Sequence, residues 1–124
     1  MKRAVKVSLI ASAVLGVVLL AGAFWLESQF GGTPPEIADG LSPQFVEGSI
    51  SFNERVKARF PAGTPEGELI DTLRAQGFSI DVDQKMARFE QRGLICKLVW
   101  QVSWKMEQLG AISNVDGAYW GVCI

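Results

Sequence analysis

The chain has no histidine among its 124 residues and only two cysteines. Histidine is the commonest general base near neutral pH and the commonest metal ligand, so its absence disfavours the usual hydrolytic and metal sites. Cys96 and Cys123 are far apart in the sequence, and two cysteines without histidine make a poor zinc site. We therefore predict a non-enzymatic protein with no catalytic residue, no cofactor and no metal ion.

The chain also lacks the excess of bases that is typical of nucleic-acid-binding proteins. It has 12 Lys and Arg against 13 Asp and Glu, a net charge of -1. Lys2, Arg3 and Lys6 precede every acid, which leaves 12 − 3 = 9 bases against 13 acids, about -4, in the rest of the chain. Nucleic-acid binding needs clustered bases that displace counterions from phosphates, so we expect no nucleic-acid partner.

What the N-terminus does have is a long apolar stretch, residues 7–26, without a single charge. A helix of this length spans about 30 Å, the thickness of a bilayer core. The bases before it predict that this end stays in the cytoplasm. We predict a signal anchor at residues 1–26, in the inner membrane and single-pass, with the C-terminal domain in the periplasm. The alternative is a signal peptide cleaved after Ala23, which would release a soluble periplasmic protein.

Residues 27–48 are rich in glycine and proline and carry few periodic apolar residues. Gly31-Gly32 and Pro34-Pro35 are typical of chain segments without regular structure. We predict a flexible linker over residues 27–48, long enough to hold the following domain clear of the membrane. The domain itself is then predicted to cover residues 49–124.

The first helix of this domain is predicted to begin at Ser51. Ser51 and Glu54 have the spacing of a capping box, in which each side chain satisfies an exposed backbone N–H group. Phe52, Val56 and Phe60 follow at intervals of four residues and form one apolar face of the helix. The helix is expected to end before the proline that follows Phe60.

A second helix is predicted after a short loop, so that the two form a helical hairpin. Thr64 suits the N-cap, and Pro65 suits the first helical position, where its missing N–H group costs nothing. Leu69 and Leu73 belong to the buried stripe. Gly77 is predicted to adopt the left-handed conformation that ends the helix, which folds the next residue, Phe78, back onto Leu73.

The central strand runs from Leu94 to Met106. Its alternate residues form an apolar face, which consists of Cys96, Leu98, Trp100, Val102, Trp104 and Met106. A strand around residues 86–90 precedes it, and a strand over residues 111–124 follows it. Asp116-Gly117 interrupts the last strand and is predicted to form a bulge or a kink. The predicted fold is α+β, with the helical hairpin packed on a three-stranded antiparallel sheet.

Cys96 and Cys123 are predicted to form a disulfide. If Lys105 pairs with Ala111 across the turn, Cys96 lies opposite Trp120, and an extra residue or two at the bulge brings Cys123 within reach. Disulfides persist in exported proteins, and a small domain gains stability from one. The alternative is a pair of buried thiols.

Two neighbouring aromatic residues, Tyr119 and Trp120, are the candidate partner-binding residues. Successive side chains of a strand point to opposite faces, so one of the two is expected to face away from the core. Exposed tryptophan and tyrosine are frequent anchors at protein interfaces. The alternative for either residue is a place in the core.

Residues 50–124 resemble the BamE-like (SmpA/OmlA) envelope domains and the repeats of the β-lactamase inhibitor protein, in which two helices precede a three-stranded meander. The likeness rests on Gly63-Thr64 followed by Leu69-Ile70 and Leu73. It departs from the family in the spacing of glycine and threonine and in the position of Gly77. The strand with Cys96, Trp100, Val102 and Trp104, and the terminal residues Tyr119, Cys123 and Ile124, are similar to those of small exported proteobacterial proteins.

This resemblance implies binding rather than catalysis, although fold-level likeness does not assign a function. We expect a membrane-anchored binding or assembly module of the bacterial cell envelope, with an envelope protein as its partner. The alternative is an exported inhibitor of an envelope hydrolase.

Overall fold

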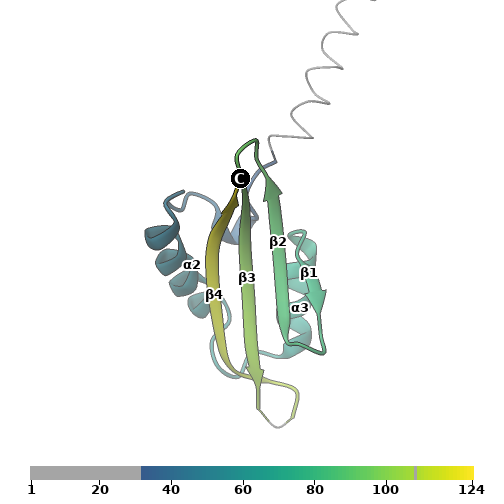
Figure 1. Cartoon of the computed structure of the whole chain (residues 1–124). Coiled ribbons are helices and arrows are strands. Elements are labelled where there is room, and N and C mark those ends of the chain that lie inside the picture. The colour runs from purple at the N-terminus through teal and green to yellow at the C-terminus, as the bar shows by residue number, and fades with distance from the viewer. Residues whose placement is uncertain (1–31, 108) are drawn as a thin grey trace, which may run out of the picture. The chain divides into compact units, whose positions relative to one another are not determined.

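The computed structural model is organised around a four-stranded antiparallel sheet in which strands that follow one another in sequence also lie side by side (Figure 1). The strands are β1 (Ser79–Asp81), β2 (Met86–Arg92), β3 (Cys96–Met106) and β4 (Ile112–Cys123). The helices are the 3-10 helix η1 (Glu36–Ala38), α2 (Phe45–Arg59) and α3 (Glu66–Ala75). The α+β class is confirmed. The prediction of three strands was wrong, because the residues after α3 form a short strand that pairs with the start of β2.

The structure describes residues 32–107 and 109–124. The membrane anchor predicted at residues 7–26, and the predicted cleavage point after Ala23, lie outside these residues. Within the two described ranges, no helix is both long enough and apolar enough to cross a bilayer. The tether to the membrane therefore stays a prediction from the sequence.

The folded domain begins earlier than residue 49, the predicted boundary. The compact unit that contains the sheet starts at Thr33. Ile37 and Ala38 in η1 are buried in the core, and the Ile37 N–H group donates to Gln76 Oε1 at 2.8 Å. The linker prediction therefore fails from residue 33 onward, because these few apolar side chains cover a part of the core that lies between the two long helices.

Helix α2 begins at Phe45, more than a turn before the predicted start at Ser51, so the expected capping box lies inside the helix. Gly48 is buried on the same stripe as Phe52 and Val56. A Cβ atom at Gly48 would collide with the carbonyl oxygen of Ser42 and with the ring of Tyr119. This glycine therefore permits a close contact inside a helix, and it does not mark a linker.

Helix α3 ends as predicted. Leu69 and Leu73 are fully buried, and Gly77 has a φ of 95°. The N–H groups of Gly77 and Phe78 donate to Arg74 O at 3.0 Å and Leu73 O at 3.1 Å, which is the Schellman motif.

The start of α3 differs from the prediction. Thr64 makes no capping bond to the helix, because its hydroxyl group donates to Pro61 O at 2.6 Å. The first helical residue is Glu66, and Pro65 takes the N-cap position. Pro65 also forms an isolated bridge with Ala111, which ties this loop to the sheet.

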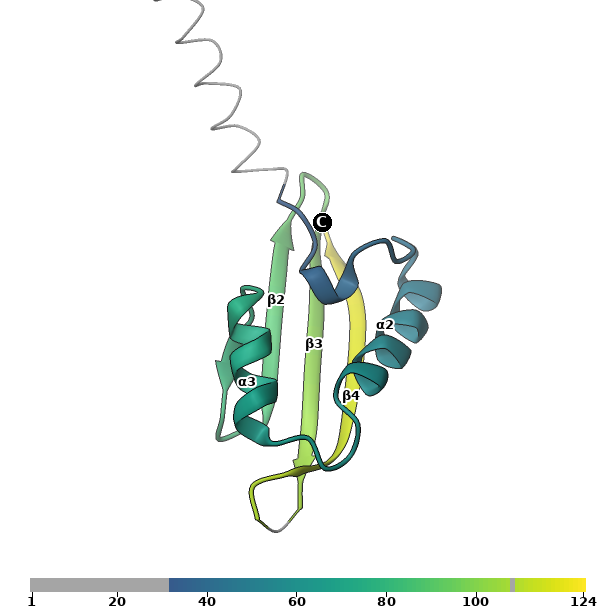
Figure 2. The ribbon, with the colours of Figure 1, turned by 180° about the vertical axis from the view of Figure 1, so that it is seen from behind.

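Both long helices cover the same face of the sheet but lie over opposite edges (Figure 2). Helix α2 packs on β4 and α3 packs on β1, with η1 between them. The predicted helical hairpin is therefore not a paired unit, since each helix is held mainly by the sheet. We call the covered side the inner face and the other side the outer face. The inner-face core includes Phe52, Val56, Phe60, Leu69, Leu73, Ala87, Trp100, Val102, Trp104, Ile112, Val115 and Tyr119.

Strands β3 and β4 pair along almost their whole length, and the predicted bulge at Asp116-Gly117 was wrong. The register shifts instead between Lys105 and Met106, where Ser113 is the extra residue of β4. Glycine is required at position 117 by packing and not by a bulge. A Cβ atom there would lie 2.9 Å from Val56 Cγ2, so the glycine permits the close approach of α2.

Side chains of helix α2 also form hydrogen bonds with backbone groups along the free edge of β4, the last strand of the sheet. Asn53 Oδ1 accepts a hydrogen bond from the Gly117 N–H group at 2.9 Å, and Ser49 Oγ accepts one from the Tyr119 N–H group at 3.1 Å. Lys57 Nζ donates to Val115 O at 2.8 Å. Because the three side chains are spaced by four residues, one stripe of the helix occupies the edge that could otherwise pair with another strand.

Candidate functional site

Cys96 and Cys123 form the predicted disulfide. The two residues lie directly opposite each other at the ends of β3 and β4. Lys105 pairs with Asn114, not with Ala111, so the alignment arises from a longer turn and needs no insertion at residues 116 and 117. The bond closes a loop with a sequence separation of 27, which contributes about 3–4 kcal/mol in the chain-entropy model.

Of the two candidate binding residues, Tyr119 faces inward. Its ring stacks on Trp100 with centroids 5.0 Å apart and an interplanar angle of 19°. Its hydroxyl group donates to Pro43 O at 2.9 Å. Burial raises the pKa of the Tyr119 hydroxyl above its usual range, because the charged phenolate would lose its hydration. Tyr119 is thus a buried, protonated hydrogen-bond donor of the core.

Trp120 lies on the outer face, opposite Val99 of β3. The guanidinium of Arg88, from β2, lies 5.7 Å from the centroid of the Trp120 ring. Arg88 and Trp120 come from strands on either side of β3, so their side chains meet above it. Val99 is only 2% exposed although none of the described helices covers this face, which places it beneath this pair. We call Arg88, Val99 and Trp120 the Trp120 cluster.

A hydrogen bond from a neighbouring strand orients the arginine of the Trp120 cluster. Arg88 Nη2 donates to Gln101 Oε1 at 2.8 Å, which orients the guanidinium next to the indole. A cation above the face of tryptophan is attracted by the ring quadrupole. Sequence reasoning found Trp120 but missed Arg88 and Val99. The sequence feature that could have indicated this cluster is Val99, an apolar residue between Lys97 and Gln101 on an otherwise polar face of the strand.

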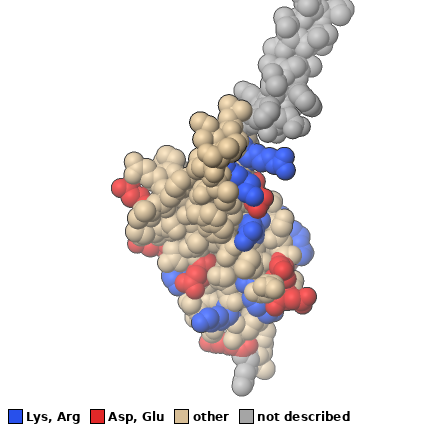
Figure 3. All heavy atoms as spheres, in the orientation of Figure 1, with Lys and Arg blue, Asp and Glu red and all other residues tan. Residues whose placement is uncertain are grey.

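The rest of the outer face carries charges of both signs (Figure 3). Lys97 Nζ lies 3.5 Å from a Glu90 oxygen, and Lys57 Nζ, from α2, lies 3.1 Å from a carboxylate oxygen of Asp116. Exposed ion pairs of this kind contribute little stability. They also balance the surface charge, so this face does not select for a partner of one sign.

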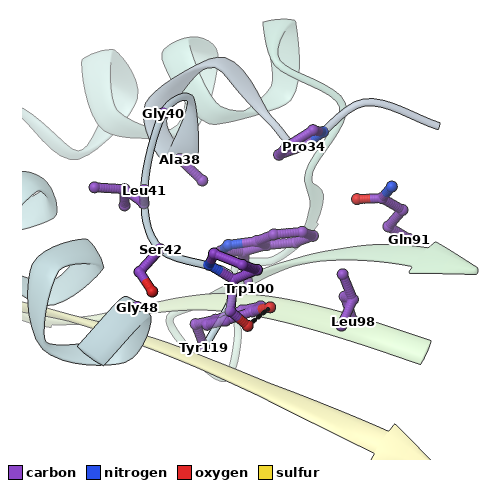
Figure 4. A pocket seen from close by; sticks show the side chains of 11 residues that line it. Pro34, Ala38, Gly40, Leu41, Ser42, Gly48, Gln91, Leu98, Trp100 and Tyr119 are labelled. Atoms are coloured by element: carbon purple, nitrogen blue, oxygen red, sulfur yellow. Dashed lines mark hydrogen bonds between the residues drawn. The ribbon is translucent and has the colours of Figure 1, made fainter. Parts of the chain in front are cut away.

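A small pocket opens on the inner side, between η1 and the sheet (Figure 4). Trp100 and Tyr119 form its floor, and residues 38–43 pass over them. Its volume is about 200 Å³, below the roughly 300–1,000 Å³ of most ligand sites. None of its lining residues is charged: they are Pro34, Ala38, Gly40, Leu41, Ser42, Pro43, Gly48, Gln91, Leu98, Trp100 and Tyr119. The pocket offers room for a single apolar group but no charged side chain for acid–base chemistry.

One carboxylate with a shifted pKa belongs to the inner face. Glu66 Oε2 accepts hydrogen bonds from Lys85 Nζ and from Trp104 Nε1, both at 2.8 Å. These bonds, first that of Lys85 and then that of Trp104, hold the pKa of Glu66 below its usual range, because they favour the charged form. Glu66 therefore serves the fold: it satisfies the N–H group of a buried indole and ties the start of α3 to the sheet.

A second acidic residue, Asp81, has a local structural role. Asp81 Oδ1 accepts a hydrogen bond from the Gln84 N–H group at 3.1 Å, which stabilises the turn between β1 and β2. Among residues 32–107 and 109–124, no group of three or more cysteine, aspartate or glutamate side chains is placed to hold a metal ion.

No family model, curated protein or solved structure was found to match this chain. The BamE-like resemblance therefore stays a prediction from short motifs and topology. The candidate site that remains is defined by the structure alone: the Trp120 cluster on the uncovered face of the sheet.

Proposed function

We propose that this chain is a non-enzymatic binding or assembly module of the bacterial cell envelope. In this proposal residues 7–26 anchor it in the inner membrane, and the domain lies in the periplasm. The observation that carries the proposal is the Trp120 cluster, an ordered tryptophan–arginine pair on the sheet face that the helices leave uncovered.

The chemistry of the Trp120 cluster is that of an interface anchor. Tryptophan and arginine are the residues most enriched among those that dominate binding energy. Arg88 is already oriented by Gln101, and Val99 provides a dry floor beneath the indole. A preorganised surface loses less side-chain entropy when a partner docks, so more of the contact energy appears as affinity.

Two further observations favour binding over catalysis. The pocket above Trp100 and Tyr119 is lined without any charged residue. The carboxylate whose pKa is lowered, Glu66, is engaged by Lys85 and Trp104. Catalytic acids and bases usually have pKa values tuned towards the working pH, and the shift at Glu66 goes the other way.

The periplasmic location is supported by the disulfide and by the charges around the apolar stretch. Disulfides persist in the bacterial periplasm and are rare in the cytosol. Three bases precede residues 7–26, which is the arrangement that leaves the following domain outside the cytoplasm.

Photocrosslinking in living cells tests the proposal. A photoreactive amino acid at Ala118, beside the Trp120 cluster, is compared with one at Asp71 on the exposed side of α3. We expect one discrete crosslinked product from position 118, lost in Trp120→Ala, and no such product from position 71. Identical products from both positions, or a product at 118 that does not depend on Trp120, would contradict the proposal.

The identity of the crosslinked protein distinguishes the assembly function from the inhibitor function. A partner that belongs to an envelope assembly complex supports the proposal. An envelope hydrolase that loses activity in a one-to-one complex with this chain would instead identify an inhibitor.

A further inference from the structure

The end of the sheet that carries the disulfide also carries a group of exposed apolar side chains. Leu94 is 78% exposed, Ile95 70%, Val122 53% and Ile124 106%. The Ile124 N–H group donates to Ile95 O at 3.0 Å, so the β2–β3 loop and the end of β4 lie side by side (Figure 1). We call these four residues the apolar tip.

The apolar tip is held in its exposed position by covalent and backbone constraints. The Gly93 N–H group donates to Cys96 O at 3.1 Å, which closes the loop tightly. A Cβ atom at Gly93 would lie 2.6 Å from the same oxygen, so only glycine fits there. The disulfide then ties Cys96 to β4. Because both ends of the loop are fixed, Leu94 and Ile95 cannot fold back to bury their side chains in the core.

The charged residues within the loop at the tip are both basic, and the nearest acid in sequence, Glu90, lies 3.5 Å from Lys97 Nζ. Residues 91–98 and 117–124 contain Arg92 and Lys97 and no acid. In Figure 3 uncharged atoms form this end of the molecule, with Lys and Arg atoms at its border and Asp or Glu atoms beside them. An apolar surface bordered by bases is the composition that favours the interface of an anionic bilayer.

The described chain also begins at this end. Pro34 lines the same pocket as Gln91 and Leu98, a cross-strand pair close to the disulfide. The predicted membrane span ends at residue 26 and the compact unit begins at Thr33. Residues 27–32 reach at most about 20 Å when fully extended. If residues 7–26 span the membrane, only residues 27–32 connect them to the compact unit, far fewer than the linker expected from the sequence. Pro34, at the start of that unit, lies at the end of the sheet that carries the apolar tip.

We propose that the apolar tip docks on the periplasmic surface of the membrane that holds the predicted anchor. Leu94 and Ile95 enter the headgroup region, and Arg92 and Lys97 contact lipid phosphates. The inference rests on the membrane anchor of the proposed function. It adds an orientation to that function, because a domain held at its tip keeps its sheet upright and leaves the Trp120 cluster accessible from the side.

Lipid quenching of a site-specific fluorophore tests this docking. The full chain is reconstituted in vesicles of phosphatidylcholine and phosphatidylglycerol, with or without brominated acyl chains, and carries a fluorescent amino acid at position 95. Leu109 is the matched control position, because it is a fully exposed apolar residue in the turn at the opposite end of the sheet. We expect brominated lipid to reduce the fluorescence at position 95 and not at position 109. The loss at position 95 should diminish in Leu94→Asp, and also when Arg92 and Lys97 are both changed to glutamine.

Two outcomes overturn the inference. One is unquenched fluorescence at position 95. The other is equal quenching at positions 95 and 109, which would mean that the domain lies on the bilayer without a preferred end. Alkaline extraction of the same vesicles tests the anchor separately. A chain that resists extraction but is unquenched at position 95 disproves only the tip docking, whereas an extracted chain disproves the anchor as well. Self-quenching at position 95 without lipid quenching would show that a second copy covers the tip.

Discussion

The two faces of β3 are formed by alternate residues of one strand, but they are buried in different ways. On the inner face, Trp100, Val102 and Trp104 lie beneath helices that precede the strand by tens of residues. On the outer face, Val99 is buried by side chains of the neighbouring strands alone. The difference indicates that the inner face contributes most of the stability of the domain, whereas the described helices leave the outer face uncovered. Substitutions on the two faces should therefore have unequal effects.

The largest expected effect is that of Trp100→Ala on the inner face. This change removes the ring that stacks on Tyr119 and packs edge-on against Phe89. Truncation of a buried aromatic residue lowers the free energy of unfolding by about 3–5 kcal/mol. Chemical denaturation followed by circular dichroism measures the loss. A variant as stable as the parent would mean that Trp100 does not face the core.

The disulfide is expected to have an effect of similar size. Changing Cys96 and Cys123 together to alanine should lower the free energy of unfolding by about 3–4 kcal/mol, chiefly because the unfolded chain gains freedom. Denaturation midpoints of the double variant and of the reduced parent protein should agree. If reduction leaves the parent's midpoint unchanged, the bond does not form in the folded protein.

The glycines of β4 distinguish rigid from adaptable contacts on the inner face. Gly117→Ala should cost about 1–3 kcal/mol, because the new Cβ atom meets Val56 and the backbone of Asn53. Gly121→Ala should cost less, since the obstacle there is the far end of the Phe45 ring, which can swing away. Thermal unfolding of both variants tests the order. Equal losses would contradict the packing of α2 on β4.

The ion pair at Glu66 predicts a pH dependence. The folded-state pKa of Glu66 is lowered, so its contribution is complete above the unfolded value of about 4.3 and is lost as the pH falls through the folded value. At neutral pH, Glu66→Gln should cost an amount near the lower end of the roughly 1.5–3 kcal/mol that is typical for a hydrogen bond to a charged group.

Denaturation of Glu66→Gln and of the parent from neutral to acidic pH should show the gap in stability shrinking as the pH falls. A gap that widens in acid would reverse the assigned direction of the pKa shift. Glu68→Gln is the matched control, because its carboxylate makes only a long, exposed contact of 3.7 Å with Arg59.

The smallest expected effect on stability is that of Trp120→Ala on the outer face. The ring is half-buried and contacts side chains of the sheet, so the loss should stay below about 1 kcal/mol for an interaction of this kind. The same variant should abolish crosslinking from position 118. If Trp120→Ala destabilised the domain as much as Trp100→Ala, the two faces would be equivalent, and a binding role for the outer face would lose its support.

The elements that the sequence predicted well depend on neighbours in the chain. The alternation from Cys96 to Met106 is a property of one strand, and the end of α3 at Gly77 depends on residues within two turns. The disulfide followed from strand pairing across one turn, even though the predicted register was displaced. Local backbone geometry is sufficient for each of these features.

The elements that the sequence did not predict depend on residues far apart in the chain. Gly48 falls at the end of the predicted linker and Gly117 within the predicted bulge, yet each lies where α2 and β4 touch. The start of α2 at Phe45 and the burial of Ile37 likewise depend on surfaces that exist only after the sheet forms. Sequence periodicity does not encode which partner will occupy the space that a glycine leaves.

The sequence by itself determined the α+β class, the apolar face of β3 and the cysteine pair, because periodicity and turn residues act over short distances. Only the tertiary structure decided that Tyr119 faces the core and Trp120 the surface, that Arg88 reaches Trp120 across a strand, and that the folded domain begins at Thr33. The physical reason is that these features depend on contacts between distant segments, and such contacts form only when the whole sheet and its helices pack together.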